Sequence, residues 1–340
     1  MAINFFKNKS ILCPYCLAEI KYAGEITSCD DKRGHGCKEK FPPLYYQNHR
    51  VAPPFFIQMI GWSQVGKSTY FYALTQSLQR MDRFWGSSNF TIMPETDETM
   101  EYMREVENMR SCDSIPSVTK RTDKQQAYIM ELKNMPRWGN RTVVTRDVPG
   151  EIFDPLFFEE KFIPYFMHVP TTIMLFSPSD TEGQPKHQMS FLMSGFINTL
   201  AKNRYDPSRQ QKHVVVVIAK ADKLLTGNSG GQELPESLKE YLRNDPFDFQ
   251  HSPVPIDNTY MDKYMSELKQ LGSTIQEYVM NQVPFGRQFV IQANQNGIKL
   301  DFCLISSLGG DPGQNNQMQI VQRPLRVMDP LLLALDYQSS

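Results

Sequence analysis

Six strand-sized apolar runs recur along the chain, separated by longer stretches of mixed polarity. They lie at 55–60, 128–132, 141–145, 171–176, 213–218 and 300–305. The five consecutive β-branched residues at 214–218 are typical of a parallel strand that is buried on both faces. After the first run, apolar residues return at spacings of three and four from Tyr70 to Met81, which predicts a helix. The pattern therefore predicts an α/β fold, with a sheet flanked by helices.

Composition places the chain among globular proteins. Its 340 residues are 40% hydrophobic and include 21 Phe and 15 Tyr, enough for a substantial core, which excludes disorder of the whole chain. The 36 Lys and Arg residues balance 37 Asp and Glu residues, so nucleic acid is not an expected partner of the whole surface. No apolar run reaches the roughly 18 residues of a membrane span. Since the start has no signal-peptide pattern, we expect a cytoplasmic protein.

A group of four cysteines lies near the N-terminus: Cys13, Cys16, Cys29 and Cys37. Two thiolate pairs at this spacing can meet on one tetrahedral Zn²⁺ in a closed structural site. The apolar residues around them are too few for a core without that cross-link. His35 could replace one thiolate, and a redox Cys-x-x-Cys is the other interpretation, although a redox motif does not need the second pair. The sequence thus predicts a zinc ribbon at residues 1–41, a type of module that often docks partners.

A proline-rich stretch follows at residues 42–54. Pro42-Pro43 and Pro53-Pro54 enclose it, and a residue before proline disfavours the helical conformation. We therefore expect an extended linker here, followed by one larger domain at residues 55–340. Basic residues of the ribbon alternate with acidic ones, which argues against a nucleic-acid contact there.

The first predicted strand runs into the glycine-rich loop G-x-x-x-x-G-K-S, and the predicted helix follows it. This placement is typical of a phosphate-binding P-loop. Glycines let backbone N–H groups turn towards a phosphate, Lys67 can reach the β- and γ-phosphate oxygens, and the Ser68 hydroxyl can bind Mg²⁺. The residues expected to bind the phosphates are Gly61, Ser63, Gln64, Val65, Gly66, Lys67, Ser68 and Thr69.

A second motif, D-x-x-G, follows the strand at 141–145. Asp147 can hold Mg²⁺ and its water shell, and the Gly150 amide can contact a γ-phosphate and release when that phosphate departs. In the segment between the two motifs, Thr119 is placed to close over Mg²⁺ and the γ-phosphate, with Thr122 as the alternative. These residues predict a site that distinguishes a nucleoside triphosphate from a diphosphate.

Two later strand ends carry residues suited to a nucleotide base. The strand at 213–218 leads into Ala219-Lys220-Ala221-Asp222. Asp222 can accept hydrogen bonds from the two donor groups of guanine, and the Lys220 stem can cover the base plane. The last strand leads into Ser306, Ser307 and Leu308, where backbone amides can meet the guanine carbonyl.

Taken in order, GWSQVGKS, DVPGE, AKAD and SSLGG resemble the successive nucleotide-binding motifs of translation-factor and Ras-like GTPases of the TRAFAC class. The resemblance covers about residues 54–335. The cysteine ribbon, the Gly-Glu of the second motif and the terminal VMDPLL are similar to the bacterial double-GTPase group, which gene context implicates in prokaryotic conflict systems. The resemblance implies a Ras-like sheet with flanking helices, guanine-nucleotide binding and GTP hydrolysis.

Two residues depart from the family pattern. The base-recognition motif usually begins with Asn or Thr, whereas Ala219 lacks a polar side chain, so guanine preference is expected to be reduced. A Gln usually follows the switch glycine, whereas Glu151 stands here. Its carboxylate can orient water but adds negative charge near the phosphates, so slow hydrolysis is expected.

Two features near the second motif allow more than one interpretation. Arg146, Lys120 and Arg121 could supply positive charge to a transition state, although a solvated surface position is the more frequent role of such residues. The aromatic stretch at 153–166, broken by Pro155 and Pro164, is either an effector surface that reports the nucleotide state or packing against the sheet.

The motifs together predict a switch that hydrolyses GTP to GDP. Lys67 would neutralise phosphate charge, Ser68, Thr119 and Asp147 would hold Mg²⁺, and Glu151 would position the attacking water. A non-hydrolysing nucleotide-binding scaffold and an ATPase remain the alternatives. The expected partners are a protein effector or regulator and, as a homo- or heterodimer, another GTPase.

Overall fold

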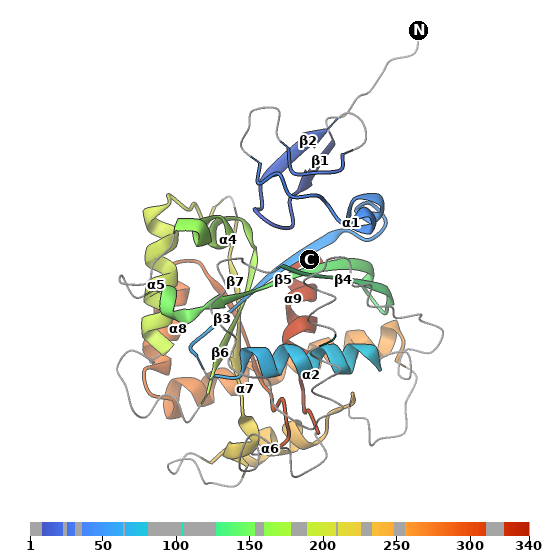
Figure 1. Cartoon of the computed structure of the whole chain (residues 1–340). Coiled ribbons are helices and arrows are strands. Elements are labelled where there is room, and N and C mark those ends of the chain that lie inside the picture. The colour runs from blue at the N-terminus through green and yellow to red at the C-terminus, as the bar shows by residue number, and fades with distance from the viewer. Residues whose placement is uncertain are drawn as a thin grey trace.

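The computed structural model describes residues 9–22, 26–30, 36–63, 65–80, 104, 127–153, 160–177, 189–208, 210–225, 233–247, 256–310 and 323–339. They form a small two-stranded ribbon and a larger α/β body (Figure 1). Six candidate residues of the expected sites lie outside the described residues: His35, Gln64, Thr119, Lys120, Arg121 and Thr122.

Each apolar run expected to be a strand overlaps an observed one. The strands are β1 (Lys9–Leu12), β2 (Glu19–Tyr22), β3 (Pro54–Gly61), β4 (Ala127–Met135), β5 (Gly139–Pro149), β6 (Thr171–Phe176), β7 (His213–Ile218) and β8 (Lys299–Leu304). The α-helices are α1 (Pro43–Asn48), α2 (Lys67–Gln79), α4 (Ile163–His168), α5 (Met189–Lys202), α6 (Glu236–Arg243), α7 (Asn258–Gln282), α8 (Gly286–Gln295) and α9 (Asp329–Ser339). Short 3-10 turns form η2 (Gly150–Phe153), η3 (Glu160–Phe162) and η6 (Ala221–Leu224).

The main sheet has the strand order β4-β5-β3-β6-β7-β8. β4 runs antiparallel to β5, and all other neighbours are parallel. Every residue of β6 and β7 is buried, because helices cover both faces of the sheet. The carboxyl ends of β3, β5, β7 and β8 therefore open onto one edge of the sheet, where ligands bind in folds of this kind. The predicted α/β class with a flanked, mostly parallel sheet is confirmed.

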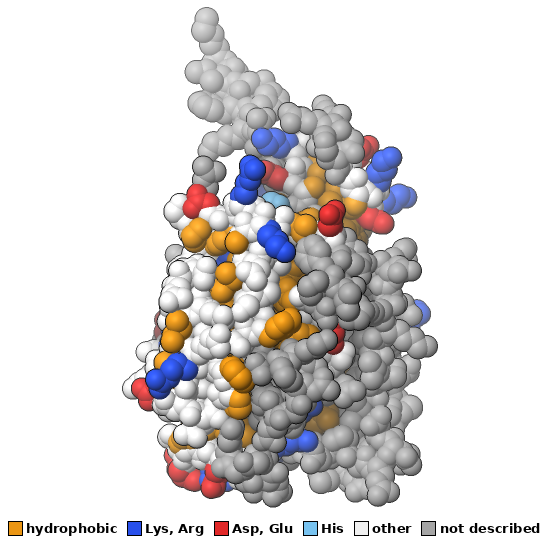
Figure 2. Space-filling view, turned by 90° about the vertical axis from the view of Figure 1, so that its left-hand side faces the viewer, with side chains coloured by type: hydrophobic (Ala, Val, Ile, Leu, Met, Phe, Trp, Pro, Cys, Tyr) orange, Lys and Arg blue, Asp and Glu red, His pale blue; other side chains and the backbone are white. Residues whose placement is uncertain are grey.

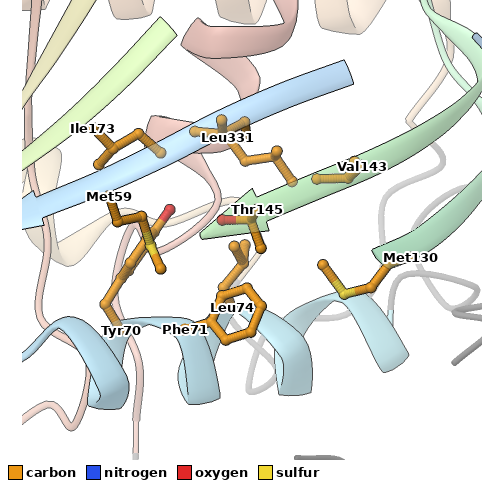
Figure 3. Close-up of a pocket in the computed structure, with 10 residues that line it drawn as sticks. Met59, Tyr70, Phe71, Leu74, Met130, Val143, Thr145, Ile173 and Leu331 are labelled. Atoms are coloured by element: carbon orange, nitrogen blue, oxygen red, sulfur yellow. The ribbon is translucent and has the colours of Figure 1, made fainter. Parts of the chain in front are cut away.

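Helix α2 packs tightly onto one face of this sheet. Tyr70, Phe71 and Leu74 project from α2 towards Met59 of β3 and Val143 of β5, around a narrow pocket that α9 also lines (Figure 3). All residues from 70 to 78 are buried, as expected for a helix covered on every side. This packing fixes the first turn of α2 against the end of β3.

The opposite group of helices, α4, α5 and α8, packs together on one flank of the molecule (Figure 1). Figure 2 faces this flank and shows hydrophobic side chains in small separate groups, with Lys and Arg side chains widely spaced. Phe191 of α5 and Ile291 of α8 are exposed. Single exposed hydrophobic side chains of this kind are normal on a protein surface.

Two expectations about local conformation are wrong. The segment expected to be extended contains α1, because Pro43 lies in the first helical turn, where its missing N–H costs nothing. Tyr45 of α1 is buried and its hydroxyl donates a 2.6 Å hydrogen bond to Leu12 O, which ties the helix to the ribbon. Pro164 likewise begins α4 rather than breaking a helix.

The aromatic residues that follow the second motif pack inside the protein. Phe153, Phe162, Tyr165 and Phe166 are buried, and Phe153 and Phe166 are in ring contact. The packing interpretation is therefore correct for these residues, while residues 154–159 lie outside the described part. Among the helices that are described, none combines the length and the apolar character needed to cross a membrane.

Candidate functional site

A glycine-rich turn joins the end of β3 to the start of α2. Gly66 has a φ of +103°, in the left-handed region that glycine adopts without strain, and so lets the chain turn into the helix. No side chain of the described residues caps α2, whose first turn contains Ser68 and Thr69. The first amide groups of any helix have no acceptor within the helix itself, and such a helix start is a suitable site for phosphate.

Lys67 is the first residue of α2, and its ammonium group bends back over the loop. Nζ donates hydrogen bonds to the carbonyl oxygens of Gly61, at 2.7 Å, and Trp62, at 3.2 Å. It lies 3.9 Å from Asp147 Oδ1. Because an ammonium group has three donors, one remains for a phosphate oxygen. The loop itself therefore fixes the position of this charge.

The second motif lies directly against the loop. Gly61 at the end of β3 is opposite Pro149 of β5 in the parallel register. A Cβ atom on Gly150 would lie 3.0 Å from Gly61 O and 3.1 Å from Trp62 N. Both neighbours are backbone atoms, so any residue larger than glycine would push the motif away from the loop. A displacement of Gly150 therefore changes its contact with the backbone of Gly61 and Trp62.

Asp147 is half-buried beside Lys67. Burial raises the pKa of its carboxyl, the Lys67 ammonium lowers it, and the Glu151 carboxylate raises it, with a net rise. Its Oδ1 atom is enclosed and has no hydrogen-bond partner among the described residues. An enclosed carboxylate oxygen without a donor fits Mg²⁺, which prefers oxygen ligands, and Ser68 offers a hydroxyl in the first turn of α2. The residues present therefore fit this metal.

Glu151 binds the loop through its carboxylate. Oε1 accepts a 2.7 Å hydrogen bond from the Ser63 amide. Burial alone would raise the pKa of Glu151, but the hydrogen bonds from Ser63 and the nearby Lys67 ammonium outweigh burial and lower it. An ionised carboxylate is thus held at the loop that is expected to bind phosphate. Its charge opposes that of a γ-phosphate.

The base-recognition residues come together at the ends of β7 and β8. Lys220 adopts the left-handed conformation, with a φ of +53°, at the turn after β7. Its Cε atom is 4.0 Å from the position of a Cβ on Gly66, so the Lys220 stem extends towards the phosphate loop. The Ser306 hydroxyl donates a hydrogen bond to Asp222 Oδ1 and accepts one from the Gly309 amide, at 3.0 Å. Ser306 therefore orients the carboxylate of Asp222, a role that its sequence position did not reveal.

The remaining loop residues are placed as follows. Val65 is buried beneath the glycine turn, and Ser307 and Leu308 continue the loop that Ser306 begins. All expected phosphate and base residues that are described thus lie at the carboxyl ends of β3, β5, β7 and β8, or in the loops and first turns that follow them. The sequence predicted that Arg146 lies either in solvent or near the phosphates. It does neither, because it is buried and binds the ribbon.

The four cysteines of the ribbon converge on one point. Their sulfur atoms all lie within 4.8 Å of one another. Cys13 Sγ is 3.7 Å from Cys37 Sγ, and Cys16 Sγ is 3.5 Å from Cys29 Sγ. Tetrahedral zinc with bonds of about 2.3 Å separates its sulfur ligands by roughly 3.8 Å. The donor set and its spacing therefore fit Zn²⁺.

The electrostatics of this cluster also favour a cation. The hydrogen bond to Cys16 and burial raise the pKa of Cys13, the hydrogen bond with Cys13 lowers the pKa of Cys16 to about 4, and burial raises the pKa of Cys29 to about 12. Several thiolates cannot share such a site without positive charge, whereas a divalent metal ion neutralises much of their charge on binding.

We expect the purified protein to contain one Zn²⁺ per chain. Replacing Cys16 by serine should remove most of the zinc and loosen the ribbon without abolishing nucleotide binding, because the sheet has its own core. Metal analysis and thermal unfolding of both proteins would measure this, with Cys112→Ser as the control outside the cluster. Wild-type protein without zinc, purified without chelators, would contradict the assignment.

A family model and solved structures are similar to this chain. A family model described as Double-GTPase 2 matches residues 56–276. No curated protein sequence matches the chain. Among solved structures, the chain is similar to the GTPase-like domain of Ski7 from S. cerevisiae in two forms, one bound to GDP and inorganic phosphate and one bound to GTP. Sequence identity is 15% and 14%, the TM-score is 0.37 for both, and each match covers 84% of this chain but only 50% of the Ski7 chain.

Proposed function

The chain belongs to the Double-GTPase 2 family, and on this basis we propose that it is a nucleotide-controlled switch that binds and hydrolyses GTP. The observation that carries the proposal is the arrangement of Lys67, Asp147 and Gly150 around one glycine-rich loop. A loop of this kind has the charge and amide groups for phosphate, and the second motif touches it where a terminal phosphate would lie.

The residues of the loop and of the neighbouring motifs have separate tasks in this proposal. Lys67 and the amide groups at the start of α2 bind the β- and γ-phosphates and neutralise their charge. Ser68, Asp147 and Thr119 hold Mg²⁺, which neutralises phosphate charge when bound. Gly150 lies so close to the loop that a side chain would not fit between them, and its amide group can therefore contact the γ-phosphate and report its presence.

Asp222 and Lys220 support guanine as the base. The Asp222 carboxylate is oriented by Ser306 and can accept hydrogen bonds from both guanine donors, whereas adenine presents neither in that arrangement. The Lys220 stem would cover the base plane. Ala219 offers no side-chain hydrogen bond to the base or to the phosphate loop, so the preference for GTP over ATP is expected to be modest.

Competition binding distinguishes the proposed GTPase from an ATPase. Stronger displacement of a fluorescent guanine nucleotide by GTP than by an equal concentration of ATP would support a preference for guanine, and equal displacement by both would overturn it. Single-turnover hydrolysis then distinguishes a switch from a non-hydrolysing scaffold. Bound GTP that is released unchanged would favour the scaffold.

Glu151→Gln is expected to accelerate hydrolysis. The glutamine keeps an oxygen that can accept the Ser63 amide but removes the negative charge next to the γ-phosphate. A barrier lowered by about 1.4 kcal/mol corresponds to a roughly ten-fold faster single turnover. Glu277→Gln, on an exposed position of α7, is the matched control. Loss of hydrolysis in Glu151→Gln would show instead that the carboxylate is needed to position water.

We further propose a division into a zinc ribbon at residues 1–41, a linker at 42–54 and a GTPase domain at 55–340. We also propose a protein effector or a second GTPase as the partner, in prokaryotic conflict or signalling, which is what the sequence resemblance to the double-GTPase group implies. Affinity capture with the protein held in its GTP and GDP forms would test this. A partner that binds both forms equally would contradict a nucleotide-controlled interaction.

A further inference from the structure

The zinc-ligand turn of the ribbon rests on the strand that carries the second motif. Pro14 and Tyr15 lie between Cys13 and Cys16, and both expose carbonyl oxygens to Arg146 of β5. Arg146 Nη2 donates a 2.6 Å hydrogen bond to Pro14 O and a second bond to Tyr15 O. The Tyr165 hydroxyl, from α4, also donates to Tyr15 O. Figure 1 shows β1 and β2 next to α1 and above the main sheet, consistent with this contact.

Arg146 is an unusual residue to find in this position, because it is charged and only 4% exposed. Its guanidinium lies 4.3 Å from the centre of the Tyr165 ring. Nε and Nη1 are enclosed and have no hydrogen-bond partner among the described residues. Burial lowers the pKa of Arg146, while Tyr165 and the ribbon cysteines Cys13, Cys16 and Cys37 raise it. A buried cation of this kind needs a nearby anion.

The metal-loaded cysteine cluster would supply that anion. Zinc bound by four thiolates carries a net charge of about −2. No carboxylate forms an ion pair with Arg146 in the part of the chain that the structure describes, and within that part the cysteines of the ribbon are a nearby source of negative charge. Arg146 thus contacts the metal-binding turn through backbone oxygens and would compensate the charge of a metal-loaded site.

The same strand segment reaches the candidate nucleotide site. Arg146 and Asp147 are consecutive, and consecutive side chains of a strand point to opposite faces. Arg146 therefore faces the ribbon and α4, while Asp147 faces Lys67 at 3.9 Å. Three residues further along, Gly150 touches the phosphate loop. Two residues of β5 connect the two sites without any intervening element.

We propose that Arg146 couples the metal state of the ribbon to the nucleotide state of the phosphate loop. With metal bound, the Cys13–Cys16 turn presents its carbonyl oxygens to Arg146 and holds the end of β5 in the arrangement that binds Mg²⁺ and GTP. Loss of the metal frees the turn, deprives the buried guanidinium of its acceptors and counter-charge, and displaces Asp147 with it. This inference rests on the proposed function, since it requires that the loop bind nucleotide.

Thermodynamic linkage supplies a sharp test. If the metal strengthens Mg·GTP binding by some factor, Mg·GTP must strengthen metal binding by the same factor. Coupling between sites typically amounts to about five-fold or more. We therefore expect the equilibrium affinity for Zn²⁺, measured by competition with a chromophoric chelator, to rise at least about five-fold when Mg²⁺ and a non-hydrolysable GTP analogue are added.

Variants separate coupling from simple stabilisation. Arg146→Met keeps much of the length of the side chain but removes its charge and donors. In this variant the ratio of the Zn²⁺ affinities with and without Mg²⁺ and the GTP analogue should fall to about one. Arg141→Met is the matched control, because Arg141 lies on the same strand but its Nη1 donates a 2.8 Å hydrogen bond to the carbonyl oxygen of its neighbour, Asn140. If Arg146→Met does not fold, Tyr165→Phe removes one hydrogen bond to the same turn with little change in volume, and should reduce the factor partially.

The outcomes distinguish the coupling from the proposed function. Nucleotide binding is measured directly in the same samples, with a fluorescent analogue. Normal nucleotide binding together with unchanged Zn²⁺ affinity in the wild type would overturn the coupling and leave the GTPase proposal intact. Absence of nucleotide binding in the zinc-loaded protein would overturn both. A factor that persists in Tyr165→Phe and Arg146→Met would show that the metal acts by another route.

Discussion

Replacing Lys67 with alanine is expected to weaken Mg·GTP binding on the order of 100-fold. The ammonium of Lys67 is fixed over the loop by the carbonyl oxygens of Gly61 and Trp62, with one donor left for phosphate. A hydrogen bond to a charged group is worth about 1.5–3 kcal/mol, and about 1.4 kcal/mol corresponds to a factor of ten. Because alanine removes both the bond and the charge, the loss should lie near the upper end of that range.

Titration with a fluorescent GTP analogue would measure the change, and single-turnover hydrolysis would follow any bound nucleotide. Lys263→Ala is the control, since Lys263 is an exposed lysine of α7 far from the loop in sequence. Thermal unfolding should be measured for both variants, because the two carbonyl oxygens lose their donor in Lys67→Ala. Unchanged GTP affinity in a folded Lys67→Ala protein would refute the phosphate-loop assignment.

Features that depend on a few consecutive residues could be predicted from the sequence. The strand at 213–218 is a run of β-branched residues, and the structure buries all six of its residues. The glycine loop is also local, because Gly66 adopts the left-handed conformation at the start of α2. Both predictions follow from backbone sterics and side-chain pattern, which act within one element.

Features that depend on contacts between distant segments could not be predicted. Arg146 was expected at the surface because charged residues usually lie there, yet it is buried against a turn 131 and 132 positions earlier in the chain. The contact between Ser306 and Asp222 spans 84 positions and depends on the pairing of β7 with β8. The short helix α1 was missed because the proline rule describes the residue before proline, whereas Pro43 itself starts the helix.

Asp222→Asn is expected to exchange the base preference of the site. Asp222 Oδ1 is held by the Ser306 hydroxyl, which gives the carboxylate a defined orientation. Guanine offers two donors to it, and the asparagine amide replaces one acceptor oxygen by a donor. A mismatched buried pair costs roughly 1–3 kcal/mol, so GTP affinity should fall about ten- to 100-fold.

Xanthine nucleotide provides the complementary measurement. Its C2 carbonyl accepts where guanine donates, so the amide of the variant should pair with it, and xanthosine triphosphate should bind Asp222→Asn more tightly than it binds the wild type. Asp262→Asn, an exposed acid of α7 whose partner is Arg137, controls for the loss of one negative charge. A general loss of affinity for both nucleotides would indicate a disturbed loop, whereas a reversal of preference can arise only if the side chain at 222 contacts the base. If the variant and the wild type bind GTP, ATP and xanthosine triphosphate alike, Asp222 does not read the base, and the guanine assignment fails with it.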